Sequence, residues 1–160
     1  MSSRAAIAAL VIAAGTACHS DLFYSASDPI VGHWRAAPMA QQPSGEYLRT
    51  LDLAVDGRYV RTGTFRGVYP QLPGDAIASI SRAYGRYVYE NDQLRLSQDS
   101  VRSWDYMTGD HLDVGPGGIS IEGPPTIPAV ELTADRLILR YMVNPGAGYV
   151  PVQEEYFRDR

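Results

Sequence analysis

The chain contains no lysine and only one cysteine, Cys18, among its 160 residues. A single cysteine excludes an internal disulfide. All 14 basic residues are arginine, and 18 acidic residues outnumber them to give a net charge of −4. The chain therefore lacks the excess of positive charge that is typical of nucleic-acid-binding proteins, and no nucleic-acid partner is expected.

Few windows of the chain have helical periodicity, whereas residues typical of strands and turns are abundant. The sequence holds 11 tyrosines, 15 glycines and 11 prolines. Aromatic residues favour strands, and glycine and proline favour the turns between them. We therefore expect an all-β protein, and 160 residues suit one domain.

The N-terminus has the pattern of a secretory signal. Arg4 precedes an apolar segment, residues 5–14, which is too short to span a bilayer, and small residues 15–17 lead to Cys18. The pattern resembles a bacterial lipoprotein signal, which implies a signal peptide over residues 1–17, a lipid on Cys18, a tether over 18–29 and a domain over 30–160. The alternative is ordinary cleavage after Ala17, which would leave a soluble periplasmic protein.

The central hairpin is predicted from its apolar pattern. If residues 91–92 form a two-residue turn, Tyr89 pairs with Leu94 and Tyr87 with Leu96, so that four apolar side chains share one face.

Two further hairpins follow the same reasoning. A turn at residues 134–135 would pair Leu132 with Leu137 and Val130 with Leu139. At Gly57, a three-residue loop would place Leu53 opposite Tyr59, and a two-residue loop would place it opposite Val60; the first is preferred because it turns Phe65 inward.

Two stretches are irregular. Residues 70–83 have partly helical spacing and predict a single helical turn or a loop as readily as a helix. Residues 108–128 predict a long loop with a short strand at 119–121, and loops of this length are commonly functional. The remaining pattern predicts eight or nine short antiparallel strands in an up-and-down order, closed into a barrel of about eight strands that removes the exposed edges.

Short motifs resemble those of the bacterial lipocalin-like lipoproteins. They are a Gly-x-Trp at Gly32 and Trp34, a Leu-x-x-Asp-Gly-x-Tyr-like run over residues 53–59, a Gly-x-Tyr-x-x-x-x-Asp-x-Leu run over 85–94, and a terminal Tyr-Phe-Arg at 156–158. The resemblance implies a lipocalin-like barrel in which Trp34 closes one end and Arg158 packs across it, with Arg140 as the competing partner. The chain has neither the disulfide nor the Thr-Asp-Tyr loop of true lipocalins.

An eight-stranded barrel either fills its interior with side chains or holds one small ligand. The candidate ligand-lining residues are Tyr87, Tyr89, Arg102, Trp104, Tyr106 and Tyr141.

The sequence indicates a catalytic or metal-binding site less clearly than it indicates the fold. Asp110, His111 and Asp113 form the single cluster that suggests metal or acid–base chemistry, but a solvated turn explains it better, so no metal or cofactor is expected. The sequence predicts a non-catalytic binding module for a small apolar or amphipathic ligand. We expect it to be an outer-membrane lipoprotein that faces the periplasm. The alternatives are an interaction or inhibitor module that uses the barrel surface and, less favoured, an enzyme.

Overall fold

The computed structural model describes residues 24–37, 39–41, 45–67, 76–115, 126–127, 129–144, 146 and 148–159. This part of the chain is all-β and contains no helix, as the composition predicts. The predicted signal peptide, residues 1–17, and Cys18 lie outside the described residues.

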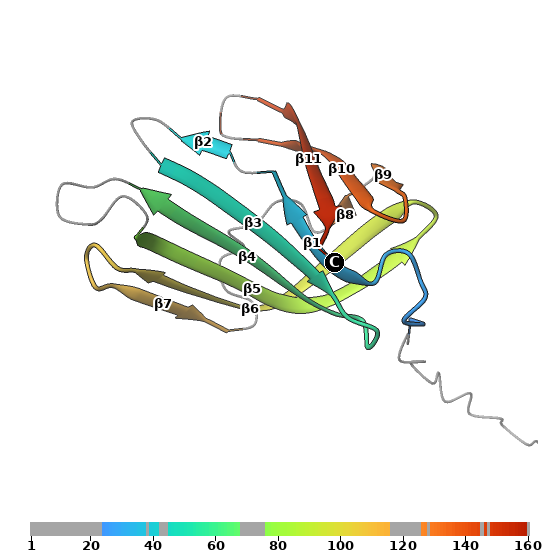
Figure 1. The fold of residues 1–160 in the computed structure, drawn as a ribbon, viewed down its shortest axis with the longest axis horizontal. Helices are drawn as coiled ribbons and strands as arrows, with labels where there is room; N and C mark the ends of the chain where they lie inside the picture. The colour runs from blue at the N-terminus through green and yellow to red at the C-terminus, as the bar shows by residue number, and fades with distance from the viewer. Residues whose placement is uncertain are drawn as a thin grey trace, which may run out of the picture.

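Eleven strands make up one antiparallel sheet (Figure 1). They are β1 (Gly32–Ala36), β2 (Met39–Gln41), β3 (Gly45–Leu53), β4 (Arg58–Gly67), β5 (Ile77–Glu90), β6 (Gln93–Asp105), β7 (His111–Val114), β8 (Thr126–Ile127), β9 (Ala129–Leu132), β10 (Arg136–Val143) and β11 (Val150–Arg158).

Nine strands lie in the order β7-β6-β5-β4-β3-β1-β11-β10-β9, while β2 pairs with β3 and β8 pairs with β6 off this path. The expected closure into a barrel is wrong, because the sheet is open. Strands β8 and β9 lie between β6 and β10 but pair with different neighbours: β8 pairs with β6 at Leu94 and Arg95, and β9 pairs with β10. Among the described residues, no strand pairs with both β6 and β10.

The predicted hairpins are confirmed. Tyr89 lies opposite Leu94 and Tyr87 opposite Leu96, and both turn residues between them have positive φ, 52° at Asn91 and 57° at Asp92. Two consecutive left-handed residues define the type I′ turn that suits the strand twist.

The other two hairpins also have the predicted register. Leu132 lies opposite Leu137, and Leu53 lies opposite Tyr59 with Gly57 left-handed at φ 74°. Local turn chemistry thus fixes these pairings before any long-range contact is considered.

Two local expectations need correction. Residues 77–83 belong to the long strand β5, which pairs with β4 on one side and β6 on the other, so two ladders of backbone hydrogen bonds override the helical spacing. Strand β6 ends at Asp105, and Tyr106 lies in the following turn, where the Asp105 carboxylate accepts hydrogen bonds from the backbone N–H groups of Met107 and Thr108. The long loop predicted over 108–128 contains two strands, β7 and β8, and the short strand predicted at 119–121 lies outside the described residues.

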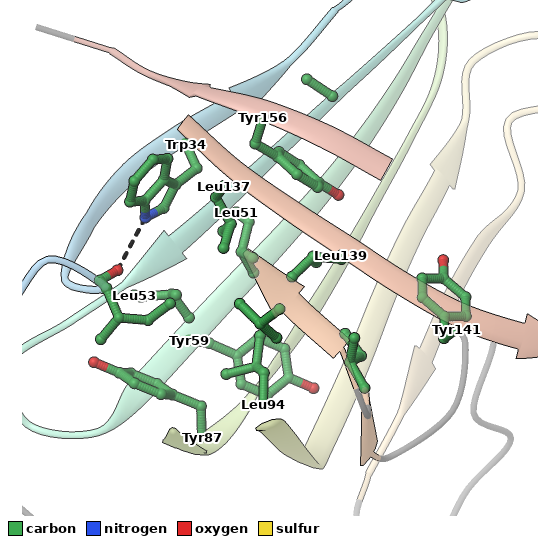
Figure 2. Packing of buried hydrophobic residues seen from close by; sticks show 14 of the residues in the cluster. Trp34, Leu51, Leu53, Tyr59, Tyr87, Leu94, Leu137, Leu139, Tyr141 and Tyr156 are labelled. Carbon is green, nitrogen blue, oxygen red and sulfur yellow. Dashed lines mark hydrogen bonds between the residues drawn. The ribbon is translucent and has the colours of Figure 1, made fainter. Parts of the chain in front are cut away.

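One face of the sheet, here called the inner face, carries the core. Figure 2 shows side chains of β10 and β11 packed against those of β1, β3, β4, β5 and β6. The largest fully buried members include Trp34, Leu51, Leu53, Tyr87, Leu94, Leu137, Leu139 and Tyr156. Side chains alternate along each strand, so the residues between them belong to the opposite, outer face.

Candidate functional site

A buried carboxylate interrupts the apolar inner face. Glu154 on β11 is 3% exposed, and its position on the strand lies between inward-facing Val152 and Tyr156. It sits near the point where β1 ends, because Ala36, the last residue of β1, pairs with Tyr156. Beyond this point no β1 residue separates β11 from β3.

Two arginines from the other side of the inner face reach this carboxylate. Arg61 on β4 donates to both oxygens of Glu154, at 2.9 Å to Oε1 and 3.0 Å to Oε2, and Arg49 on β3 donates to Oε1. Both arginine side chains are nearly buried, at 14% exposure for Arg49 and 12% for Arg61. The cluster therefore places two positive charges and one negative charge in a region of low dielectric.

Tyrosine hydroxyls complete the cluster. The hydroxyl of Tyr156 donates to Glu154 Oε2 at 2.9 Å. Burial raises the pKa of Tyr156, and burial followed by the charge of Glu154 raises the pKa of Tyr141, although Arg61 partly opposes both shifts. Both hydroxyls therefore keep their protons at neutral pH, which suits them as donors to a carboxylate.

Half-buried apolar residues surround the cluster toward the end of the sheet. Val152 and Val143 lie on one side, and Tyr47 and Phe65 lie on the other. The Tyr47 hydroxyl occupies the space where Gly63 would carry a Cβ, so a cross-strand glycine makes room for this ring. We call Glu154, Arg49, Arg61, Tyr141 and Tyr156 the inner-face cluster.

A buried hydroxyl lies on the same face. Ser81 on β5 pairs with Gly63 in the register, and its Oγ is buried with no hydrogen-bond partner within the described part of the chain. An unpartnered buried hydroxyl is costly in a folded protein and is a feature that a bound molecule can satisfy.

The three candidate tyrosines of the inner face have different surroundings. Tyr87 is 2% exposed; its hydroxyl donates to the carbonyl of Ala54 at 2.8 Å and its ring stacks on Tyr24 at 4.8 Å. Tyr141 belongs to the cluster, and Tyr89 is half-buried, with its hydroxyl donating to Asp92 at 3.0 Å. Two of the three, Tyr87 and Tyr141, are therefore core residues.

The other three candidates lie elsewhere. Val101 is fully buried on the inner face, so its neighbour Arg102 and, two residues further, Trp104 point to the outer face. Tyr106 is 57% exposed in the turn after β6. Strand alternation therefore separates Arg102 and Trp104 from the candidate tyrosines of the inner face.

The contact predicted between Trp34 and Arg158 is present. The Arg158 guanidinium lies 4.3 Å from the centroid of the Trp34 ring, and its Nη1 fills the space that a Cβ at Gly32 would need. The competing partner, Arg140, instead bonds Glu131 at 3.1 Å and Gln153 at 3.0 Å. Because the sheet is open, Trp34 and Arg158 join β1 to β11 rather than closing a barrel.

The acidic cluster on β7 does not assemble a site. Asp113 forms an exposed ion pair with Arg102 at 3.2 Å, and His111 is exposed and paired with Trp104 in the register. Across the described ranges, no three histidine, cysteine, aspartate or glutamate side chains are grouped to hold a metal. Three of the four residues from Asp110 to Asp113 thus belong to an exposed strand rather than to the expected turn.

Sequence reasoning missed the inner-face cluster, although a signal for it exists. Arg49 lies two residues from Leu51, Arg61 two from Tyr59, and Glu154 two from Tyr156, so each charge occupies an inward position in an alternating strand. A charged residue in phase with buried residues indicates a buried ion pair or a polar site.

Comparison with models of protein families, with curated proteins and with solved structures found no match to this chain. Among the described residues, no helix has the length and apolar character needed to cross a membrane. Functional inference therefore depends on the residues themselves.

Proposed function

We propose that this protein is a non-catalytic binding module that holds a small amphipathic molecule against the inner face of its sheet. In this proposal the N-terminal lipid on Cys18 attaches it to the bacterial outer membrane, facing the periplasm. A relationship to the lipocalin-like lipoproteins fits the motifs around Trp34 and Arg158 and belongs to the same proposal.

The inner-face cluster is the observation that carries the proposal. Two nearly buried guanidinium groups converge on the carboxylate of Glu154, so the cluster concentrates charged hydrogen-bond donors on an otherwise apolar face. Hydrogen bonds between guanidinium groups and an anion are stronger than neutral ones, above all away from water. An anionic head group beside Arg49 and Arg61 would add further hydrogen bonds of this kind.

The residues around the cluster suit the apolar part of an amphipathic molecule. Tyr47, Phe65, Val143 and Val152 are half-buried apolar residues on the same face. An acyl chain or other apolar body packed against them would lose water-exposed surface, while its acidic head reached the arginines. A carboxylate suits the guanidinium groups because arginine binds it through two parallel hydrogen bonds.

Native mass spectrometry of the protein purified from its own host tests for a bound molecule. We expect an added mass that is lost on denaturation, together with binding of a fluorescent fatty acid but weaker binding of the corresponding fatty alcohol. A bare mass and no fatty-acid binding would contradict the proposal.

Two neighbouring variants on β10 identify the face that binds. Val143 lies on the inner face and is half-buried, whereas Met142 is 49% exposed on the outer face. Val143→Glu should weaken fatty-acid binding about tenfold or more, because it brings a negative charge toward the head group, and Met142→Glu should leave binding unchanged. Equal effects of the two variants would place the ligand elsewhere.

The second candidate function is a protein-interaction module, and one exposed apolar surface favours it. Met142 and Tyr149 at the β10–β11 end are 49% and 72% exposed, and Pro151, opposite Met142 in the register, lines a shallow groove of about 410 Å³ together with Met142. Exposed aromatic and methionine side chains are enriched in interfaces. A partner captured from envelope extracts by the native protein and lost with Met142→Glu, but not with Val143→Glu, would support this function over the first.

A further inference from the structure

The strand register places arginine opposite arginine twice on the outer face. Arg58 on β4 pairs with Arg86 on β5, and Arg82 on β5 pairs with Arg102 on β6. Like charges directly opposite each other on neighbouring strands destabilise a sheet. The chain as a whole has a net charge of −4, so two such pairs do not follow from a generally basic sequence.

A groove of about 550 Å³ runs between the two pairs. Arg58, Arg86 and Arg102 line it together with Tyr84, Ser100 and one acidic residue, Asp99. Three guanidinium groups outnumber this one carboxylate, and with the tyrosine ring they make a surface for an anion with a small organic body.

A β-bulge lies in the middle of this groove. The β5–β6 register shifts after Tyr84, and Asp99 on β6 is left without a partner on β5. Gly85 is required beside the bulge, because a Cβ there would meet the backbone carbonyl of Ser97. Bulges that redirect side chains are common beside binding sites.

The acidic neighbours of Arg58 and Arg102 hold these two arginines only weakly. Asp56 lies 3.5 Å from Arg58 and Asp113 lies 3.2 Å from Arg102, and all four side chains are at least 42% exposed. Exposed ion pairs of this kind contribute little and are screened by salt. A multivalent anion can therefore displace these carboxylates from the guanidinium groups.

We propose that this outer-face groove binds a phosphate group, carried either by a small molecule or by a lipid head group. Phosphate has several acceptor oxygens and accepts hydrogen bonds from more than one guanidinium at once, which a single carboxylate does less well. Binding would also relieve the repulsion between the opposed arginines. The groove lies on the face opposite the inner-face cluster, so this proposal is independent of the amphipathic ligand.

Calorimetric titration of the full protein with inorganic phosphate and pyrophosphate tests the proposal, with acetate at equal ionic strength as the comparison anion. We expect phosphate and pyrophosphate to bind more tightly than acetate, and the affinity to fall as sodium chloride is added. The variant Arg58→Gln/Arg102→Gln should lose about tenfold or more in phosphate affinity.

The matched control is Arg136→Gln/Arg140→Gln on β10. It also removes two exposed arginines, each paired with an acidic residue, at Glu155 and Glu131. This variant has the same net charge as the groove variant and should bind phosphate like the unmodified protein. Both variants should unfold near the same temperature as the unmodified protein, because the pairs they break are exposed.

Vesicles distinguish the two sources of phosphate. The protein is sedimented with phosphatidylcholine vesicles and, separately, with vesicles that also contain phosphatidylglycerol. An N-terminal lipid would insert into both kinds of vesicle, so the ratio of the two bound fractions reports the effect of phosphatidylglycerol alone. Binding that depends on phosphatidylglycerol and on the groove arginines identifies a lipid head group, whereas binding of free phosphate alone identifies a small molecule. The proposal is overturned if neither form binds, or if the groove and control variants bind equally well.

Discussion

Arg158 stacks on Trp34 and at the same time bonds the backbone of two distant segments. Its guanidinium lies 4.3 Å from the Trp34 ring centroid, Nη1 donates to the carbonyl of Val31 at 2.7 Å, and Nε donates to the carbonyl of Ala134 at 2.7 Å. The Trp34 indole N–H donates to Ile30 at 3.0 Å. One side chain therefore holds the segment before β1, the β9–β10 turn and the last strand together.

Replacing this arginine should cost substantial stability. In Arg158→Gln the carbonyls of Val31 and Ala134 lose their donors and the ring loses its cation, so we expect the free energy of unfolding to fall by about 2–4 kcal/mol. Arg140→Gln, one strand away and exposed, should cost less than about 1 kcal/mol. Urea denaturation measures both, and equal losses would show that Arg158 has no special structural role.

The inner-face cluster predicts that substitutions of two neighbouring glutamates on β11 lower stability by unequal amounts. Glu154→Gln removes the carboxylate from two nearly buried guanidinium groups and should destabilise the protein by about 3–5 kcal/mol. Glu155→Gln breaks an exposed pair with Arg136 and should cost at most about 1 kcal/mol. Denaturation at pH 7 compares them. A small loss of unfolding free energy in Glu154→Gln would mean that groups other than the Glu154 carboxylate stabilise the two guanidinium groups.

Local features of the fold could be predicted, whereas the cluster could not. The turns at Asn91 and Gly57 depend on neighbouring residues, so the hairpin registers follow from the sequence. Arg49 and Glu154 are 105 residues apart, and no local pattern reveals that their strands, β3 and β11, both pair with β1. The pairing of Trp34 with Arg158 was predicted because the motifs at the two ends of the domain resemble a family, and not from spacing.

Barrel closure was predicted wrongly for a related reason. Alternation indicates that a strand has two faces, but it does not say which strand pairs with which. In the described ranges, β8 pairs with β6 through two residues and β9 pairs with β10 through four, so these two strands do not join β6 to β10. The same limit explains why Arg102 and Trp104 were named as candidate ligand-lining residues together with the tyrosines of the inner face, although they lie on the outer face.

Alkaline pH should destabilise the protein through its buried tyrosines. Burial is the main cause that raises the pKa of Tyr87 and Tyr156 above the value of 10 expected for an unfolded chain. Above pH 10 the unfolded chain releases these protons while the native state retains them. The contribution of the two tyrosines to stability is therefore fully present below pH 10 and is lost as pH rises through their native pKa values. Each fully shifted tyrosine contributes a slope of about 1.4 kcal/mol per pH unit.

Denaturant unfolding between pH 7 and 11 measures this slope. Tyr156→Phe removes one of the shifted groups, so its stability should fall less steeply above pH 10, while its difference from the unmodified protein stays constant below pH 9. Parallel curves for the two proteins over the whole range would contradict the assignment of the slope to Tyr156.

The turn at Asn91 and Asp92 predicts a stability effect that depends on backbone conformation alone. Asn91 is exposed at φ 52°, in the left-handed region where a β-branched residue is strongly disfavoured. We expect Asn91→Val to lower the free energy of unfolding by about 1–2 kcal/mol, whereas Asn91→Gly should leave it unchanged within about 0.5 kcal/mol. Because a slip of one residue in this hairpin would move Tyr87 and Leu94 out of the core, no shifted register can relieve the strain at valine. Equal stability of the two variants would show that the turn does not hold the register of β5 and β6, and that packing of the inner face does so instead.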